Sequence, residues 1–299
     1  MSGRDDGATV YLIDASPYIF RAYFSLPDSI RTPAGEPANA VHGFLSFLLK
    51  LIADEAPTHL AAAFDGSLTT SFRNDLYPPY KAQRALPPAD LETQLDFCRE
   101  VAEALGVATY IDDRYEADDI IATLARPLTA GGHRVVVVTS DKDLAQLVGP
   151  RVSLYDFGKG ERMGPAEVEE KFGVPLERIA DLLGLAGDSV DNIPGVKGVG
   201  KKTAAALITA LGDLPTVYTR LDQVAALPLR GAAALAQKLA EQREIALLSR
   251  RLATVADDAP FTATLDDLAL AGADRARVDR LFARLGFERI RERITRWRE

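Results

Sequence analysis

The stretch from residue 187 to residue 203, GDSVDNIPGVKGVGKKT, combines two kinds of chemistry. Asp188 and Asp191 are three residues apart, a spacing that would place both carboxylates on one face of a helical turn. Glycines follow, which let a backbone adopt positive φ and approach a ligand closely. The helix expected from Lys201 would offer free N–H groups to a phosphate. The residues that would form this phosphate-binding turn and helix start are Gly195, Lys197, Gly198, Gly200, Lys201, Lys202 and Thr203.

The alternative without a binding function for this stretch is a glycine-rich loop with solvated acids. A glycine pattern alone would favour that alternative. Here, the acids, the turn and the basic helix start follow one another in order, which favours a metal-ligand pair beside a phosphate-binding turn. An enzyme that cleaves a phosphodiester needs these two features at a fixed distance.

Three short apolar runs that read as buried strands are each followed by an aspartate. They are Val10–Ile13 before Asp14, Leu60–Phe64 before Asp65, and Val135–Thr139, after which Ser140 precedes Asp141. In a parallel sheet the carboxyl ends of the strands meet at one edge, where ligands bind. We therefore expect these side chains to converge there. Six further acids complete a set of nine: Glu116, Asp118, Asp119, Asp143, Asp188 and Asp191.

Acids in the first turn of a helix, as expected at residues 116–119, also offset the helix dipole. That reading accounts for one or two acids more easily than for three. The histidines are scattered and the chain has one cysteine, so no His or Cys ligand stands at a useful spacing. An all-oxygen set favours Mg²⁺ or Mn²⁺. Nine carboxylates suit two ions, about 3.5–4 Å apart, that act in phosphoryl transfer.

Residues 67–89 differ in character from their surroundings. Aromatic and basic side chains interleave there with prolines, as a channel for single-stranded nucleic acid requires: rings for stacking and cations for phosphates. The alternative is a solvated surface loop with a few buried rings. The residues concerned are Phe72, Arg73, Tyr77, Tyr80, Lys81 and Arg84.

The pattern of elements predicts an α/β fold. Apolar strands alternate with helices up to about residue 180, which indicates a mostly parallel sheet with helices on both faces. The last third reads as helices alone. We predict two domains, residues 1–180 and residues 181–299, with a helix–turn–helix motif at about residues 188–212.

Composition narrows the class of protein. The chain is 47% hydrophobic and 26% charged, as globular proteins are. Its net charge of −8 is unusual for a nucleic-acid binder, but nine carboxylates at a metal site would leave the rest close to neutral. One cysteine, no signal-peptide pattern and no run long enough for a membrane span lead us to expect a soluble, cytoplasmic protein without a membrane partner.

Taken together, the motifs resemble the 5′-nuclease (flap endonuclease) family, and most closely the nuclease domain at the front of bacterial DNA polymerase I and its stand-alone relatives. The resemblance covers roughly residues 10–255 and rests on six strings in order: LIDASPYIFRAY, AFDG, YKAQR, YEADD, TSDKD and GDSVDNIPGVKGVGKKTA. It implies a PIN-like nuclease core. The family's acidic residues map onto all nine acids given above, with Asp119 placed behind the direct ligands.

The resemblance also implies roles for other residues. Tyr80, Lys81 and Arg84 match a helical arch that admits a single-stranded 5′ end, where Lys81 and Arg84 would contact the scissile phosphate. Phe20 matches an aromatic residue that stacks on the base beside the cut. Phosphate contacts are expected from Arg21 and Arg73, and a grip on the duplex backbone from residues 195–203, with K⁺ held by main-chain carbonyls.

The leading hypothesis is therefore a two-metal, structure-specific 5′ nuclease that acts as a monomer. Its expected substrates are DNA with a 5′ flap, a nick or a single-strand/duplex junction, and RNA–DNA primers are a further candidate. The alternatives are a DNA-junction binder that kept the fold without activity, and an RNA-cutting nuclease with a related acidic site. The chain ends at Glu299, so we expect no polymerase domain of the kind fused to the family's best-known member.

Overall fold

A computed structural model describes residues 7–67 and 69–298. The outer limits of the predicted domains, residues 1 and 299, and residue 68 of the predicted arch lie outside the described residues. A six-stranded sheet stands at the centre, in the order β3-β2-β1-β4-β5-β6. Its strands are β1 Thr9–Asp14, β2 His59–Asp65, β3 Ala108–Asp112, β4 Arg134–Val138, β5 Val152–Asp156 and β6 Glu161–Met163.

Strands β1 to β5 are parallel to their neighbours, and β6 pairs antiparallel with β5 at one edge. Successive residues of β1 enter opposite cores: Ile13 packs in one hydrophobic cluster, whereas Leu12 packs in the other. A strand buried on both faces needs apolar residues at every position. This explains why the strands read as continuous apolar runs in the sequence, and the predicted mostly parallel sheet is confirmed.

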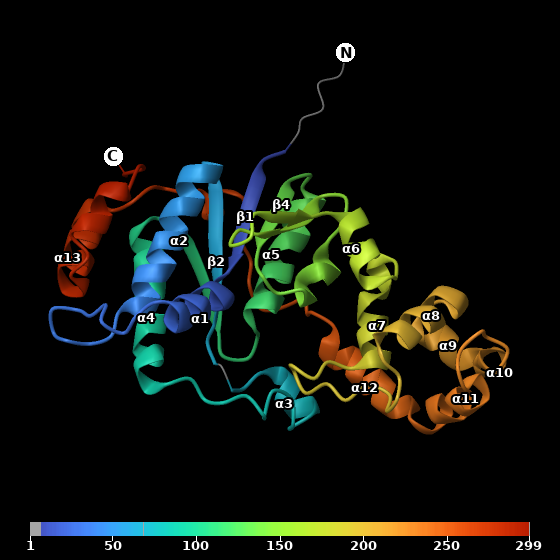
Figure 1. The fold of residues 1–299 in the computed structure, drawn as a ribbon. Helices are drawn as coiled ribbons and strands as arrows, with labels where there is room; N and C mark the ends of the chain where they lie inside the picture. Colours follow the sequence, from blue (N-terminus) through green and yellow to red (C-terminus); the bar gives the residue numbers. More distant parts are fainter. Residues whose placement is uncertain (1–6, 68, 299) are drawn as a thin grey trace, which may run out of the picture.

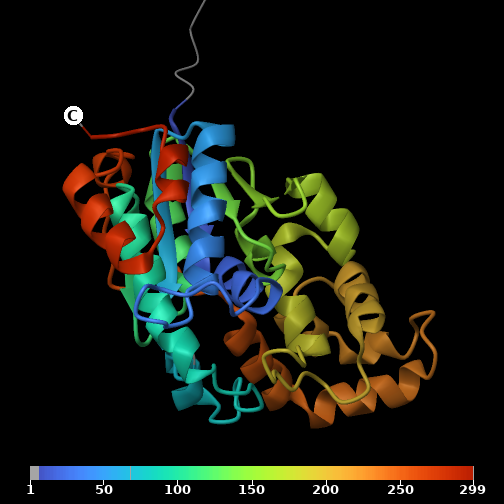
Figure 2. The same cartoon turned by 60° about the vertical axis from the view of Figure 1, so that its left-hand side comes forward.

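Helices cover both faces of the sheet (Figure 1). Four helices contribute to the first core, and Figure 2 shows them together on one side. They are α1 Ala15–Ser25, α2 Asn39–Glu55, α4 Ala89–Ala104 and α13 Arg275–Leu285. The second core contains residues of α5 Ala117–Ala130, α6 Pro165–Phe172 and α7 Ile179–Ala186.

A helical region extends from the second core. It consists of α8 Lys201–Leu211, α9 Leu214–Thr219, α10 Leu221–Val224, α11 Ala232–Glu241 and α12 Arg243–Ala253. Short 3₁₀ helices connect other parts of the chain: η1 Asp143–Leu147, η2 Leu176–Arg178, η3 Asp266–Leu268 and η4 Arg289–Arg293. The predicted C-terminal helical part is therefore present. Its end differs from the prediction, because α13 and η4 return to the first core beside α4.

The predicted helical arch contains one short helix, α3 Phe72–Leu76, which lies below the carboxyl edge of the sheet in Figure 1. Residues 77–88 form turns and irregular chain, and α4 begins at residue 89. Prolines 78, 79, 87 and 88 account for this, because proline removes a backbone donor and restricts the residue before it. In the described part of the chain, no helix is long and apolar enough to cross a bilayer.

Candidate active site

The strand-end aspartates meet at the carboxyl edge of the sheet. A cavity of about 300 Å³ opens there and receives Asp14 from β1, Asp65 from β2 and Asp141 after β4. The parallel register explains this, because β1 lies between β2 and β4. Ser16 of α1, the N-terminus of α5 and the predicted arch supply the remaining polar lining. The complete lining is Asp14, Ser16, Pro17, Phe20, Asp65, Lys81, Arg84, Ala85, Pro87, Glu116, Ala117, Asp118 and Asp141.

These carboxylates repel one another. Burial raises the pKa of Asp14 well above its usual range, and the nearby Asp65 carboxylate raises it further. Burial likewise raises the pKa of Asp118, with Asp14 and Asp141 adding to the effect. The pKa of Asp143 rises to about 7 for the same reasons, burial first and then Asp141. A bound cation would remove this repulsion, since an opposite charge favours the ionised form.

The donor chemistry therefore fits a hard divalent cation, with oxygen ligands alone and a buried Asp143 Oδ1 that has no hydrogen-bond partner. The arrangement is not a finished cage. Within residues 7–67 and 69–298, no three His, Cys, Asp or Glu side chains are placed so that they could hold an ion as they stand. Cation binding at this cluster therefore requires side-chain movement.

Basic side chains from the predicted arch already bind two of the acids. The Lys81 Nζ donates to Glu116 Oε1 at 2.5 Å and lies 3.7 Å from Asp191 Oδ2. Arg84 Nη2 donates to Asp191 Oδ1 at 2.5 Å. The Tyr80 hydroxyl donates to both acids, at 2.9 Å to Glu116 and 3.1 Å to Asp191. The structure thus places all three predicted catalytic residues beside the acidic cluster.

Arg73 and Asp119 do not line the cavity, and for Arg73 this differs from the sequence-based expectation. Arg73 was expected to contact a DNA phosphate, but its side chain is 3% exposed and donates bidentately to Asp119 at 2.7 and 2.8 Å. Asp119 is 0% exposed and accepts that pair instead of facing the other acids. This geometry argues against a DNA contact by Arg73 and agrees with a place for Asp119 behind the direct ligands.

The expected helical turn at Asp188 and Asp191 is wrong. Helix α7 ends at Ala186, and Gly187 leaves it with a φ of +70°. Asp188 and Ile193 then exchange two backbone hydrogen bonds of 3.0 and 2.7 Å, which close a loop. The two acids still reach the site from this loop, since Asp191 binds Arg84 and Lys81, and Asp188 Oδ2 lies 3.9 Å from Lys142 Nζ.

Aromatic side chains continue outward from the cavity along α1. Phe20 lines the cavity, and its ring lies 6.5 Å from that of Phe24, with 24° between the planes. Phe24 is 71% exposed and was not predicted from the sequence, although its one-turn spacing from Phe20 was a usable signal. Arg21 is exposed beside the turn at Gly158 and does not line the cavity.

Two hydroxyl groups support the acids and were also missed. Ser16 Oγ donates to Asp65 Oδ2 at 2.5 Å, and Thr139 Oγ1 donates to Asp14 Oδ2 at 2.8 Å. Both stand in the strand-end strings that deliver the acids, LIDASP and TSDKD, so their position was available in the sequence. Each fixes one carboxylate oxygen and thereby orients the acid in the cluster.

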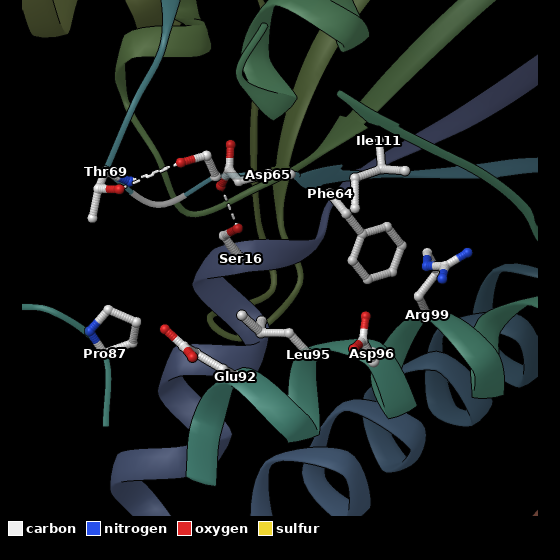
Figure 3. A pocket seen from close by; sticks show the side chains of 12 residues that line it. Ser16, Phe64, Asp65, Thr69, Pro87, Glu92, Leu95, Asp96, Arg99 and Ile111 are labelled. Atoms are coloured by element: carbon white, nitrogen blue, oxygen red, sulfur yellow. Dashed lines mark hydrogen bonds between the residues drawn. The ribbon is translucent and has the colours of Figure 1, made fainter. Parts of the chain in front are cut away.

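A second hollow of about 300 Å³ adjoins the first (Figure 3). The two share Ser16, Asp65 and Pro87. Its other walls include apolar side chains such as Leu95 and Ile111, the acids and Arg99 of α4, and the hydroxyl side chain of Thr69. Sequence reasoning did not identify this hollow, because its lining comes from separate elements with no common motif.

The glycine turn precedes α8 as predicted. Gly195 and Gly198 have φ of +61° and +86°, which only glycine adopts readily. Lys201 and Lys202 begin α8 and line a hollow of about 440 Å³ beside Lys142 and Lys171. Lys197 is exposed, and its backbone N–H donates to Gln242. The helix–turn–helix assignment and the phosphate contacts of this region, Thr203 included, stay predictions.

Comparison with known proteins identifies the family of the chain. The model of the 5′-3′ exonuclease N-terminal resolvase-like domain matches residues 9–173, and that of the 5′-3′ exonuclease C-terminal SAM fold matches residues 174–276. The division into domains at residue 180 stays a prediction. DNA polymerase I of Bacillus caldotenax is 41% identical over 95% of this chain and 32% of its own length. DNA polymerase I of Pseudomonas aeruginosa is 42% identical to this chain, and the match covers 94% of this chain and 31% of the polymerase. The chain thus spans about a third of these relatives.

Solved structures share the fold at lower identity. Bacteriophage T5 5′-exonuclease with bound zinc gives a TM-score of 0.67 at 21% identity, covering 93% of this chain and 98% of that one. The catalytic core of Rad2 in complex with DNA gives a TM-score of 0.62 at 15% identity, and the match covers 97% of this chain and 92% of that one. Human GEN1 in complex with Holliday junction DNA gives a TM-score of 0.62 at 16% identity, and the match covers 96% of this chain and 70% of that one. With this fold, two matching family models and relatives above 40% identity, the chain belongs to the 5′-3′ exonuclease family.

Proposed function

We propose that the chain is a divalent-metal-dependent, structure-specific 5′ nuclease that hydrolyses phosphodiester bonds of DNA at 5′ flaps, nicks or single-strand/duplex junctions. One observation carries the proposal. The cavity that collects the strand-end carboxylates also collects Lys81 and Arg84, so cation ligands and phosphate donors face one space. A phosphodiester bound there would meet both kinds of group at once.

Roles in this site follow from the contacts. The residues proposed to hold two Mg²⁺ or Mn²⁺ ions are Asp14, Asp65, Glu116, Asp118, Asp141, Asp143, Asp188 and Asp191. Bound cations would neutralise these acids and the charge that develops on the attacked phosphate. Lys81 and Arg84 donate to phosphate oxygens, and Tyr80 orients Glu116 and Asp191 through its hydroxyl. Phe20 offers its ring to the neighbouring base.

The remaining features fit substrate grip. The Gly195–Thr203 turn and α8 would hold the duplex backbone, with K⁺ on main-chain carbonyls. Such contacts carry no sequence information, which suits recognition of a structure. We propose a monomer that works in the cytoplasm and also accepts primers with RNA at the 5′ end.

The test is cleavage of a 5′-labelled flap duplex with Mg²⁺, Mn²⁺ or EDTA, beside a nicked duplex, a plain single strand and an RNA-flap version. We expect cleavage near the junction with Mg²⁺ or Mn²⁺ and none with EDTA. Asp141→Asn is expected to abolish cleavage while DNA binding persists. The matched control is Asp113→Asn, an exposed acid after β3 that lies outside the cavity. Tight binding without cleavage by the wild type under any metal would leave the junction-binding alternative.

A further inference from the structure

The Arg73 guanidinium uses all of its hydrogen-bonding capacity inside the protein. A guanidinium has five N–H groups. Nε donates to the Leu252 carbonyl at 2.9 Å, and Nη1 donates to Glu116 Oε2 at 3.1 Å and Asp119 Oδ2 at 2.7 Å. Nη2 donates to Asp119 Oδ1 at 2.8 Å and to the Thr254 carbonyl at 3.0 Å. Arg73 has no free donor for a substrate.

These bonds join parts of the chain that are far apart in sequence. Arg73 lies on α3 of the arch, Asp119 in the first turn of α5, and Leu252 near the end of α12. Asp119 extends the junction by accepting from the backbone N–H of Ala256 at 2.8 Å and of Glu116 at 3.1 Å. Arch, acid-bearing helix and helical region therefore meet at one buried ion pair.

Apolar packing ties the same parts together. Tyr80 of the arch, Ile193 of the loop that carries Asp188 and Asp191, and Leu252 of α12 form a small hydrophobic cluster. The loop is also bound to the arch through polar contacts, since Lys81 N–H donates to the Asp191 carbonyl at 3.0 Å. A displacement at Leu252 would thus reach the loop as well as Arg73.

The consequence for the acidic cluster lies at Glu116. Its Oε2 accepts from Arg73 and from the Tyr80 hydroxyl, while its Oε1 faces Lys81. Arg73 and Tyr80 together fix one oxygen and so set the direction in which the other points. A group that fixes a ligand from behind acts on the reaction through the ligand.

We propose that Arg73 is a positioning residue that sets the Glu116 carboxylate in the acidic cluster and ties its geometry to the end of α12, so that the helical region and the catalytic cluster are coupled through one guanidinium. This inference rests on the proposed function of the cluster. Lysine cannot replace arginine here, because an ammonium lacks the planar fork that serves a carboxylate and two carbonyls together.

The experiment compares Arg73→Met, Arg73→Lys and Arg114→Met in the full chain. Arg114 is the matched control, because it also links α3 to the start of α5, through a 2.7 Å contact with Asp75, but both side chains are 64% exposed. At a temperature where circular dichroism shows each variant folded, kcat and KM on the flap duplex and the Kd for Mn²⁺ without DNA are measured.

For Arg73→Met we expect kcat to fall and the Mn²⁺ Kd to rise, each about 10- to 100-fold. We expect KM to change by less than about threefold, because the residue does not touch DNA. Arg73→Lys should fold and still lose about tenfold in kcat. Amide hydrogen exchange in both Arg73 variants should accelerate at residues 116–119 and 253–256. Arg114→Met should match the wild type in kcat, KM, Mn²⁺ Kd and hydrogen exchange.

A folded Arg73→Lys with wild-type kcat and wild-type Mn²⁺ affinity would overturn the proposal. So would equal losses in kcat and DNA affinity with faster exchange throughout the chain, which would mark a purely structural pair. If Arg73→Met does not fold, Arg73→Lys and Asp119→Asn carry the test. A wild type that cleaves no DNA would refute the proposed function alone, since Mn²⁺ affinity and exchange still report on Arg73.

Discussion

Gly195 is the position in the glycine turn that tolerates a side chain least. A Cβ at this residue would lie 2.3 Å from the Gly187 nitrogen, 2.6 Å from the Ala186 carbonyl carbon and 2.7 Å from the Gly187 Cα. All three neighbours are backbone atoms, so no flexible side chain can move aside. Gly195 also has a φ of +61°, which strains any residue with a Cβ.

The two costs of Gly195→Ala add. The left-handed conformation costs about 1–2 kcal/mol, and overpacking of a tight contact costs about 1–3 kcal/mol. The total is about 2–5 kcal/mol, and at roughly 2–4 °C of Tm per kcal/mol the melting temperature should fall by roughly 4–20 °C. Since Gly187 precedes Asp188, the displaced backbone should also disturb that acid and lower cleavage.

Two neighbouring glycines serve as controls. Gly198 has a φ of +86°, but its nearest contact would be the flexible end of Lys238 at 3.4 Å, so Gly198→Ala should cost about 1–2 kcal/mol. Gly200 has a φ of −88° and nothing within 4 Å, so Gly200→Ala should cost about 1 kcal/mol or less, as a changed N-cap of α8.

Thermal melts followed by circular dichroism, with the flap assay below the lowest Tm, test the series. The expected order of destabilisation is Gly195→Ala, then Gly198→Ala, then Gly200→Ala. If Gly195→Ala and Gly200→Ala melt within about 1 °C of each other, the close approach between Gly195 and Gly187 has no energetic weight. The reasoning from backbone contact would then be refuted.

Two further predictions concern charged groups. Lys81→Met should lower kcat about 10²–10³-fold with little change in DNA affinity. Its control, Lys50→Met on the exposed face of α2, should change neither quantity. Equal losses in kcat and in DNA affinity would mean that Lys81 only binds DNA. At Glu103, burial raises the pKa, but Arg277, Thr109 and Arg99 together outweigh burial and lower the pKa from its ordinary value of 4.5. The stabilisation is therefore present above about pH 4.5 and is lost as the pH falls through the lowered pKa. Glu103→Gln should therefore cost about 1 kcal/mol or less at pH 7, and a Tm difference that does not shrink as the pH is lowered from 7 toward 3 would contradict this account.

The sequence predicted what local pattern controls. Each strand carries its own acid at its end, and parallel pairing of β1 with β2 and β4 then brings Asp14, Asp65 and Asp141 to one edge without further information. The destination of Arg73 could not be predicted in this way. Its acceptors Leu252 and Thr254 lie 179 and 181 residues away in sequence, and no periodicity links them to α3.

The loop at residues 187–193 shows a second limit. A spacing of three residues fits a helical turn, but it fits equally a loop in which Asp188 Oδ1 accepts from the Val190 N–H at 2.7 Å. Asx turns of this kind compete with helix for the same short polar segments. The choice falls to the backbone on either side, where Gly187 leaves α7 at positive φ and Pro194 prevents a helix from continuing through the loop.

In the proposed nuclease site, the cations of the arch would decide how the acidic cluster receives a phosphate. Lys81 is 18% exposed between Glu116 and Asp191, whereas Arg84 is 44% exposed and binds Asp191 alone. An incoming phosphate competes with these carboxylates for the same donors. Arg84 can turn toward it after breaking one solvated ion pair, which is worth little. When Lys81 turns, it gives up its pairing with two largely buried acids, although Glu116 keeps its bonds from Arg73 and Tyr80. Asp191 keeps the bond from the Tyr80 hydroxyl. In the proposed metal site, bound cations would offset the loss of Lys81. In the proposed nuclease site, we therefore expect Arg84 to meet a phosphate first and Lys81 to engage when cations neutralise the cluster.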